Sequence, residues 1–270
     1  MPSFPSGSER SPASLAGRPL FEPVAALLRG FEQLPGADAL NALARQVALA
    51  TGSGQALAFM PPVEDGLGYE QRIALCGKVE HRPDNWHDFF NALAWLAFPR
   101  AKAALSDRHG QALAEQGGQS GRGPLRDALT QFDECGVAVL CADPELAALL
   151  QHHAWKEAFW QRRADLMARV RFLVFGHALF DHLRAPFFGL CGKAVYLEVE
   201  SGWLARDAAW QRADVDARLA AWLATGLATP RDLKPLPLLG IPGVVAESEV
   251  EAWYDDVRQF RPLRGSSRAA

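Results

Sequence analysis

Three side chains that could do chemistry lie close together in a segment rich in Trp and Phe. His87 and Asn91 are four residues apart, so a helix places them about 40° apart, beside its apolar face. Asp88 falls on the other flank of that face. We predict His87 and Asp88 as catalytic groups and Asn91 as a substrate contact at the edge of the core. The alternative is structural: Asp84 or Asn85 caps the helix, Asp88 favours the helix dipole, and the histidine is a hydrogen-bonded rim residue.

A second histidine, His177, precedes Asp181 by four residues and follows an apolar run that ends at Gly176. The end of a strand that leads into a helix is a common place for ligand binding in α/β folds. A carboxylate beside a histidine can fix its tautomer and raise its basicity. We therefore predict catalytic roles for His177 and Asp181. The alternative is a solvated helix face, opposite the apolar side chains of Leu179 and Leu183.

Two neighbouring carboxylates, Asp133 and Glu134, occur in an Asp-Glu-Cys-Gly run. Carboxylate oxygens bind divalent cations, and the two histidines could complete such a site. The metal ligands that we predict are His87, His177, Asp133 and Glu134. The same run is flanked by apolar residues at 128–132 and 137–141, so it also predicts the turn of a β-hairpin.

Cationic side chains surround a glycine-rich segment, residues 110–124. They are Arg100, Lys102, Arg122 and Arg126. Four glycines between 117 and 123 predict a mobile loop, which could close over an anionic substrate. We predict that Arg100, Lys102 and Arg126 bind this substrate, and the alternative is a flexible solvated loop. The glycine spacing fits neither a Walker loop nor a dinucleotide-binding motif.

Hydrophobic periodicity predicts helices that alternate irregularly with short strands. Helices are expected at residues 20–30, 37–50, 85–98, 99–107, 177–183, 207–225 and 247–256, and after an Asp-Pro-Glu start at 143–145. Strands are expected at 56–60, near the end of 69–79, at 128–132, 137–141, 170–175 and 193–199, and an extended segment at 236–245. This order predicts an α+β fold, a mostly helical single domain with a small sheet, over residues 19–264.

The composition excludes several classes of protein. The chain has 270 residues and a formal net charge of −3, which excludes a generally basic nucleic-acid-binding protein but not a local basic patch. The four cysteines form no Cys-x-x-Cys pair. No apolar run is long enough for a signal peptide or a membrane span, so we expect a cytoplasmic protein without a membrane partner. Residues 1–18 and 265–270 are expected to be disordered tails.

Five short motifs stand out along the chain. They are Asn85-Trp86-His87-Asp88-Phe89-Phe90-Asn91-Ala92-Leu93, Phe98-Pro99-Arg100-Ala101-Lys102, Arg126-Asp127-Ala128-Leu129-Thr130 with Phe132-Asp133-Glu134, Phe175-Gly176-His177-Ala178-Leu179 and Leu239-Gly240-Ile241-Pro242-Gly243. Through them the chain resembles an uncharacterised bacterial family, the domain of unknown function 3025, over residues 20–264. The resemblance implies a soluble bacterial protein whose domain takes up nearly the whole chain. It implies no reaction.

Three functions are compatible with these residues. The first is a divalent-metal-dependent hydrolase, with a small-molecule or phosphoester substrate, in which histidines and carboxylates hold the metal or activate water. A partial likeness of Asn91, Leu93 and Leu96 to the final helix of His-Asn-His nucleases is consistent with it, although the final histidine is missing. The second is a metal-free protein that binds a small anionic ligand, and the third is a non-catalytic interaction protein. A nucleic-acid substrate is compatible with the first, and the sequence specifies no oligomeric state.

Overall fold

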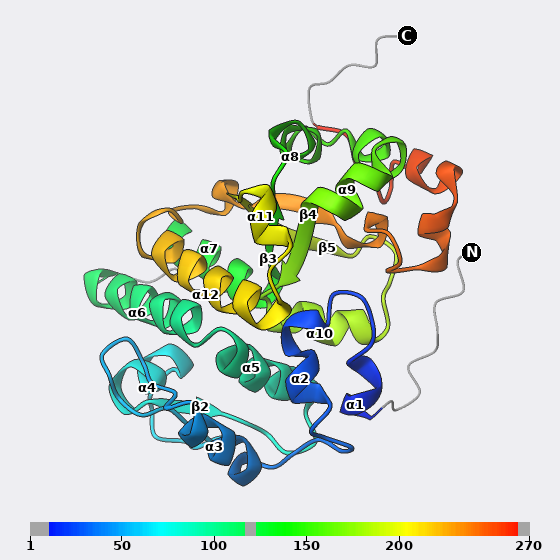
Figure 1. The fold of residues 1–270 in the computed structure, drawn as a ribbon. Helices are drawn as coiled ribbons and strands as arrows, with labels where there is room; N and C mark the ends of the chain where they lie inside the picture. The colour runs from blue at the N-terminus through cyan, green and yellow to red at the C-terminus, as the bar shows by residue number, and fades with distance from the viewer. Residues whose placement is uncertain (1–10, 117–122, 264–270) are drawn as a thin grey trace.

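The computed structural model describes residues 11–116 and 123–263 and confirms an α+β fold, in which helices surround a small sheet (Figure 1). The α-helices are α1 (Pro12–Leu15), α2 (Ala25–Leu28), α3 (Ala37–Gln46), α4 (Tyr69–Cys76), α5 (Trp86–Ala97), α6 (Pro99–Gln116), α7 (Pro124–Cys135), α8 (Pro144–Gln151), α9 (Arg163–Arg169), α10 (His177–Arg184), α11 (Ser201–Leu204) and α12 (Ala208–Thr225). The strands are β1 (Ala58–Met60), β2 (Lys78–Glu80), β3 (Gly136–Cys141), β4 (Val170–Val174), β5 (Cys191–Glu198) and β6 (Lys234–Pro237). Short 3₁₀ or π turns are η1 (Glu22–Val24), η2 (Glu157–Gln161), η3 (Pro230–Asp232), η4 (Leu238–Gly240), η5 (Ala246–Glu249) and η6 (Glu251–Asp255).

The larger sheet has four strands in the order β4-β3-β5-β6. Strand β3 pairs antiparallel with β4 and parallel with β5, while β5 pairs antiparallel with β6. All six residues of β3 are buried, as its continuous apolar run predicts for a central strand covered on both faces. Strands β1 and β2 form a separate parallel pair.

The junction of β3 and β4 sets the position of two helices. Because the two strands are antiparallel, the end of α7, which leads into β3, lies beside the start of α10, which follows β4. The carbonyl oxygen of Gly136 accepts hydrogen bonds of 2.9 Å from the N–H groups of both Phe175 and Gly176. A Cβ atom at Gly176 would lie 2.4 Å from the backbone nitrogen of Gly136, so only glycine permits this close approach.

Helix α5 lies in the middle of the molecule, between the larger sheet and the layer of α3, α4 and β2 (Figure 1). It begins at its N-cap, Asn85, whose side-chain oxygen accepts a hydrogen bond from the backbone N–H of Asp88. Every residue from Asp88 to Ala97 is buried, so α5 is a core helix. Pro99 then starts α6, and α12 packs along α6. Helix α5 also packs against α10.

Aromatic side chains fill the contact between α5 and α10. The ring of Phe90 lies 5.7 Å from those of Trp86 and Phe180, centroid to centroid, and Phe21 packs 5.7 Å from Phe180. Such aromatic pairs contribute about 0.5–1.5 kcal/mol beyond the burial of their area. This packing holds the N-terminal turns of α5 and α10 at a fixed distance from each other.

The expected β-hairpin around Asp133 and Glu134 is wrong. Residues 128–132 belong to helix α7, which continues through both carboxylates and ends at Cys135, directly before β3. Leu125, Ala128, Leu129 and Phe132 follow helical spacing and pack on the core, which outweighs the local turn propensity of Asp and Gly. Both carboxylates therefore project from the last turn of a helix.

Several other boundaries differ from the sequence-based expectations. Residues 69–76 form α4 before the short strand β2, and α6 continues to Gln116, through part of the expected loop. The tail expected at residues 1–18 includes α1, whose Leu15 is buried. The helix expected at 247–256 consists of two 3₁₀ turns. The remaining parts of the predicted loop and tails, residues 117–122, 1–10 and 265–270, lie outside the described residues.

The described part of the chain offers no helix whose length and apolar character would let it span a lipid bilayer. The extended segment expected at 236–245 is wrong beyond Pro237, where β6 ends and the 3₁₀ turn η4 begins, and the helix expected at 20–30 is the 3₁₀ turn η1 followed by the short α2. The other expected helices and strands occur, several with boundaries shifted by a few residues. The start at 143–145 is confirmed in detail, because the Asp143 carboxylate accepts hydrogen bonds from the N–H groups of Glu145 and Leu146. The fold therefore brings α5, α7 and α10 together around one end of the larger sheet.

Candidate metal centre

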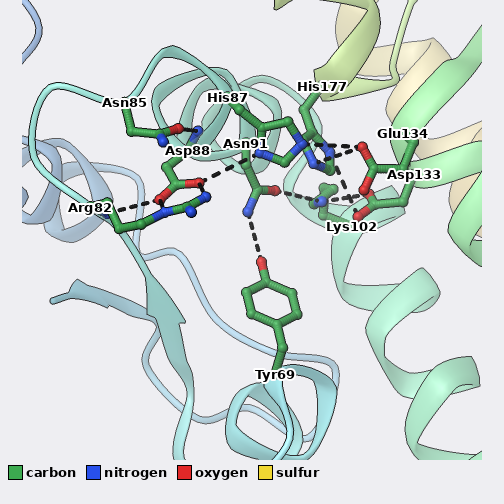
Figure 2. A network of polar contacts seen from close by, with 10 residues as sticks. All are labelled: Tyr69, Arg82, Asn85, His87, Asp88, Asn91, Lys102, Asp133, Glu134 and His177. Atoms are coloured by element: carbon green, nitrogen blue, oxygen red, sulfur yellow. Dashed lines mark hydrogen bonds and ion pairs between the residues drawn. The ribbon is translucent and has the colours of Figure 1, made fainter. Parts of the chain in front are cut away.

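Two histidines and one glutamate from three helices converge on one point (Figure 2). The Nε2 atom of His87, on α5, lies 3.2 Å from Oε2 of Glu134, in the last turn of α7. The Nε2 atom of His177, at the start of α10, lies 3.4 Å from the same oxygen. The two imidazole rings are 4.5 Å apart, centroid to centroid. One ligand atom from each residue lies within 4.8 Å of the other two, so one metal ion could contact all three.

Two of the three separations between these ligand atoms, those from Glu134 Oε2, fit tetrahedral coordination. Metal–ligand bonds of about 2.0–2.1 Å place neighbouring ligand atoms of a tetrahedral site about 3.3–3.4 Å apart. The separations from Glu134 Oε2, 3.2 Å and 3.4 Å, are close to this value. Two histidines and one carboxylate are the ligand set of many catalytic zinc sites, which leave a fourth position for water. The same three ligands also occur at non-haem Fe²⁺ sites.

The other ring nitrogen of His87 faces a second carboxylate. Its Nδ1 atom lies 3.5 Å from Oδ1 of Asp88. Arg82 binds both oxygens of Asp88 through its guanidinium, at 2.8 Å each, and donates its backbone N–H at 2.9 Å. This bidentate pair fixes the position of the Asp88 carboxylate.

His177 has an equivalent arrangement on the opposite side. Its Nδ1 atom lies 3.7 Å from Oδ2 of Asp133, and the other oxygen of Asp133 accepts a hydrogen bond of 2.5 Å from the ammonium group of Lys102. His177, Asp133 and Lys102 are all buried, with only 2% of Lys102 exposed. Both Nδ1 atoms are buried without a hydrogen-bond partner among the described residues, so these contacts are electrostatic. A carboxylate on the far side of each histidine is the arrangement from which metal-binding histidines are oriented in proteins.

Lys102 also begins a second chain of hydrogen bonds. Its ammonium group donates to Oδ1 of Asn91 at 2.9 Å, and Nδ2 of Asn91 donates to the hydroxyl of Tyr69 at 2.7 Å. Figure 2 shows Tyr69 rising from α4 to meet Asn91. The orientation of the amide follows from Lys102, which can only donate.

Hydrogen bonds set the protonation state of the more exposed histidine. The carboxylates of Asp88 and Glu134 raise the pKa of His87 to about 9, against an opposing effect of burial. Burial alone would raise the pKa of Asp88, but hydrogen bonds from Arg82 and the contact with His87 outweigh it and hold that pKa well below its usual value. His87 is therefore protonated at neutral pH in the absence of a metal ion.

The buried histidine behaves in the opposite way. Burial lowers the pKa of His177, and the positive charge of Lys102 contributes, although Asp133 opposes the shift. Burial would raise the pKa of Glu134, but its hydrogen bond with His87 and the charge of His177 lower it. The pKa of Asp133 is lowered by Lys102 and His177 against the effect of burial. At neutral pH Glu134 is thus ionised and His177 is neutral, the forms that bind metal ions, whereas His87 must first lose its proton.

A cavity of about 470 Å³ opens over these groups. It is lined by Pro62, Tyr69, Glu70, Glu80, Arg82, His87, Asp88, Asn91, Thr130, Asp133, Glu134 and His177. Five of the lining residues are carboxylic acids, whereas Arg82 is the one lysine or arginine among them. The excess of negative charge favours a cation in this cavity.

The structure brings the four predicted metal ligands together, but only three of them point at a common position. His87, Glu134 and His177 converge, while Asp133 stands behind His177 and pairs with Lys102. Asp88 and Asn91 line the same cavity, as residues near a site should. The alternative of a solvated face for His177 is wrong, because its side chain is packed between α5 and α7 and is only 5% exposed.

Four predicted residues do not line the cavity. One is Lys102, whose buried ammonium group is bound by Asn91 and Asp133 and does not face a substrate. The carboxylate of Asp181 pairs with Arg184 on α10, at 2.6 Å. Arg100 is exposed at the start of α6, and Arg126 lies in the first turn of α7. Arg122 lies outside the described residues. The structure therefore places none of the predicted substrate-binding arginines over the metal centre.

Sequence reasoning missed Tyr69, Arg82 and the acidic residues Glu70 and Glu80 at the rim of the cavity. For Arg82 the sequence contained one indication. An arginine a few residues before an aspartate in the first turn of a helix can form an ion pair with that aspartate, as Arg82 does with Asp88. Tyr69 had none, because it approaches Asn91 only through the packing of α4 against α6.

Comparison with known proteins gives one match. No curated protein and no solved structure matches the chain. The profile of a family described as a protein of unknown function, DUF3025, matches residues 58–264, which include all three converging residues. The match begins later than the resemblance at residues 20–264 implied. Because it covers most of the chain, the protein belongs to the DUF3025 family.

Proposed function

We propose that the protein is a divalent-metal-dependent hydrolase whose metal ion is bound by His87, Glu134 and His177. One observation carries the proposal: both Nε2 atoms lie within 3.4 Å of a single oxygen of Glu134, while both Nδ1 atoms face a second carboxylate. The two separations from Glu134 Oε2 match tetrahedral spacing, and with two imidazole ligands this favours Zn²⁺ among the divalent metals. A metal ion with three protein ligands lowers the pKa of a bound water to about 7 and so supplies a nucleophile for hydrolysis.

The surrounding residues support this proposal through their charges. Asp88 and Asp133 face the Nδ1 atoms of the two histidines, and Arg82 and Lys102 compensate those carboxylates. Glu134 then remains as the carboxylate that a metal ion would neutralise. The alternative of a metal-free site for a small anion is less well supported, because carboxylates outnumber the single arginine in the cavity lining.

Metal content tests the proposal directly. Untagged full-length protein, incubated with Zn²⁺ and passed through a desalting column, is expected to retain about one zinc per chain by elemental mass spectrometry. Incubation with Fe²⁺ under anaerobic conditions and with Mg²⁺ gives the comparison, and Mg²⁺ should be lost because it prefers oxygen ligands. Retention of no transition metal would contradict the proposal and favour the non-catalytic alternative.

Zinc binding is expected to depend on pH through His87. Its pKa of about 9 means that Zn²⁺ must displace a proton below that pH, so the loss of this proton should raise the affinity by at least about tenfold per pH unit from pH 7 to 9. The same raised pKa has the opposite effect on the metal-free fold. Its contribution to the free energy of unfolding is complete below pH 6.5 and is lost as the pH rises through about 9.

Calorimetry in two buffers of different ionisation enthalpy measures this proton. His87 and a zinc-bound water with a pKa of about 7 both lose a proton at pH 7.5, so nearly two protons should be released per zinc, and the number should fall towards one at pH 9.5. The same number of released protons at both pH values would show that His87 does not lose a proton when zinc binds.

A further inference from the structure

The hydrogen-bond chain beside the metal centre has a fixed direction. The ammonium group of Lys102 has no lone pair, so Asn91 Oδ1 must be the acceptor of their hydrogen bond. The amide nitrogen of Asn91 then faces Tyr69 and must donate to its hydroxyl oxygen. Tyr69 is therefore an acceptor in this contact, and its own proton points elsewhere.

The structure assigns no acceptor for that proton among the described residues, and the side chain of Tyr69 lines the cavity with His87 and His177. Burial and the nearby Asp133 raise the pKa of Tyr69 well above its usual value, so the hydroxyl stays protonated. The cavity thus contains a hydrogen-bond donor held in place by Lys102 through Asn91.

The charges of the cavity indicate what this donor meets. A phosphate group needs cationic partners, and the guanidinium of Arg82, the one arginine of the cavity lining, is already bound by both oxygens of Asp88. Arg72 and Lys102 lie outside the lining and pair with two of its carboxylates, Glu80 and Asp133. An uncharged substrate that presents a single acceptor oxygen needs no such cation and satisfies the hydroxyl of Tyr69.

We propose that the substrate is an uncharged acyl compound, an amide or an ester, and that Tyr69 donates a hydrogen bond to its carbonyl oxygen. This inference rests on the proposed hydrolase function. It makes Tyr69 a catalytic residue, because the oxygen that it contacts becomes negatively charged in the transition state. The phosphoester substrate considered from the sequence is replaced by an acyl substrate.

The reaction balances with water as the only co-substrate. The water oxygen forms a bond to the carbonyl carbon, and the π electron pair moves onto the carbonyl oxygen, where Tyr69 stabilises it. When the C=O bond forms again, the bond to the leaving nitrogen or oxygen breaks and its electron pair departs with that atom. The leaving group takes up the proton that the water lost, giving a carboxylic acid and an amine or alcohol.

Probe binding to zinc-loaded protein tests the inference without a known substrate. Acetohydroxamic acid supplies an acyl oxygen next to a metal-binding oxygen, and inorganic phosphate is the anionic comparison. By calorimetry, acetohydroxamic acid should bind the parent more tightly than phosphate does. Tyr69→Phe should weaken acetohydroxamic acid binding about fivefold to tenfold with zinc content unchanged.

Two further variants separate the role of the proton from that of the ring. Asn91→Asp keeps the phenol but offers it an acceptor, so Tyr69 should turn its proton away from the cavity and probe binding should weaken as in Tyr69→Phe. Tyr196→Phe is the matched control, because the Tyr196 hydroxyl lies on β5, outside the cavity lining, and has no hydrogen-bond partner among the described residues. It should bind the probe like the parent.

The outcomes distinguish this inference from the proposed function. If the parent takes up no zinc, the proposed function itself is contradicted. If zinc binds and Tyr69→Phe binds acetohydroxamic acid as the parent does, the role of Tyr69 is wrong while the metal centre stands. If phosphate binds more tightly than acetohydroxamic acid, the substrate is not an uncharged acyl compound.

Discussion

The His87→Ala, His177→Ala double variant is expected to retain no zinc while remaining folded. The two substitutions remove both imidazole ligands and leave Glu134 as the sole remaining member of the His87, Glu134 and His177 cluster. A single carboxylate binds Zn²⁺ too weakly to retain it through a desalting column. The loss should exceed the 10- to 100-fold that removal of an outer-shell partner typically costs. Elemental mass spectrometry of parent and variant, prepared side by side, measures it, and circular dichroism checks that the variant is folded.

A second double variant controls for the loss of histidines as such. His152 and His182 are both exposed and outside the cavity lining, so His152→Ala, His182→Ala should keep the zinc content of the parent. Zinc retained by the first variant would place the metal elsewhere on the chain. Zinc lost equally from both variants would point to non-specific binding by histidine side chains.

Lys102→Met is expected to lower the free energy of unfolding by about 3–5 kcal/mol. The ammonium group is 2% exposed and pairs with the buried Asp133 at 2.5 Å, so its removal leaves an uncompensated carboxylate in the core. It also lies 5.3 Å from the centroid of the Trp95 ring, a contact that methionine replaces without charge. Urea denaturation of the metal-free protein gives the change.

Two comparisons isolate the cause of that loss. Lys156→Met removes a lysine from an ion pair with the exposed Asp255, and it should change stability little because solvent screens such pairs. Adding Asp133→Asn to Lys102→Met should restore part of the lost stability, since the buried charge is then absent. A loss from Lys102→Met no larger than that from Lys156→Met would contradict a buried ion pair.

Local sequence patterns were sufficient to find individual residues of the site. The apolar face of residues 85–98 predicted a helix with His87 and Asn91 at its edge, and α5 confirms it. The apolar run before Gly176 predicted a strand that leads into a helix at His177, which β4 and α10 confirm. Such patterns report which residues share an element, because they arise from neighbours along the chain.

The convergence of the site could not be read in the same way. His87, Glu134 and His177 are separated by more than forty residues each, and they meet through strand pairing and helix packing. The i, i+4 rule also paired His177 with Asp181, yet the neighbours of His177 in space are Asp133 and Glu134. Tertiary contacts override helical spacing once a side chain is buried between two helices.

The antiparallel pairing of β3 and β4 has a thermodynamic consequence for ligand binding. Since the amides of Phe175 and Gly176 share the carbonyl of Gly136, the backbones that carry Glu134 and His177 are already ordered when the chain has folded. Metal binding there costs little backbone conformational entropy at these two ligands. The remaining freedom lies with the side chains of His87 and Glu134, which are 39% and 37% exposed, whereas that of His177 is 5% exposed. The affinity of the centre therefore depends chiefly on how far these two side chains must be immobilised.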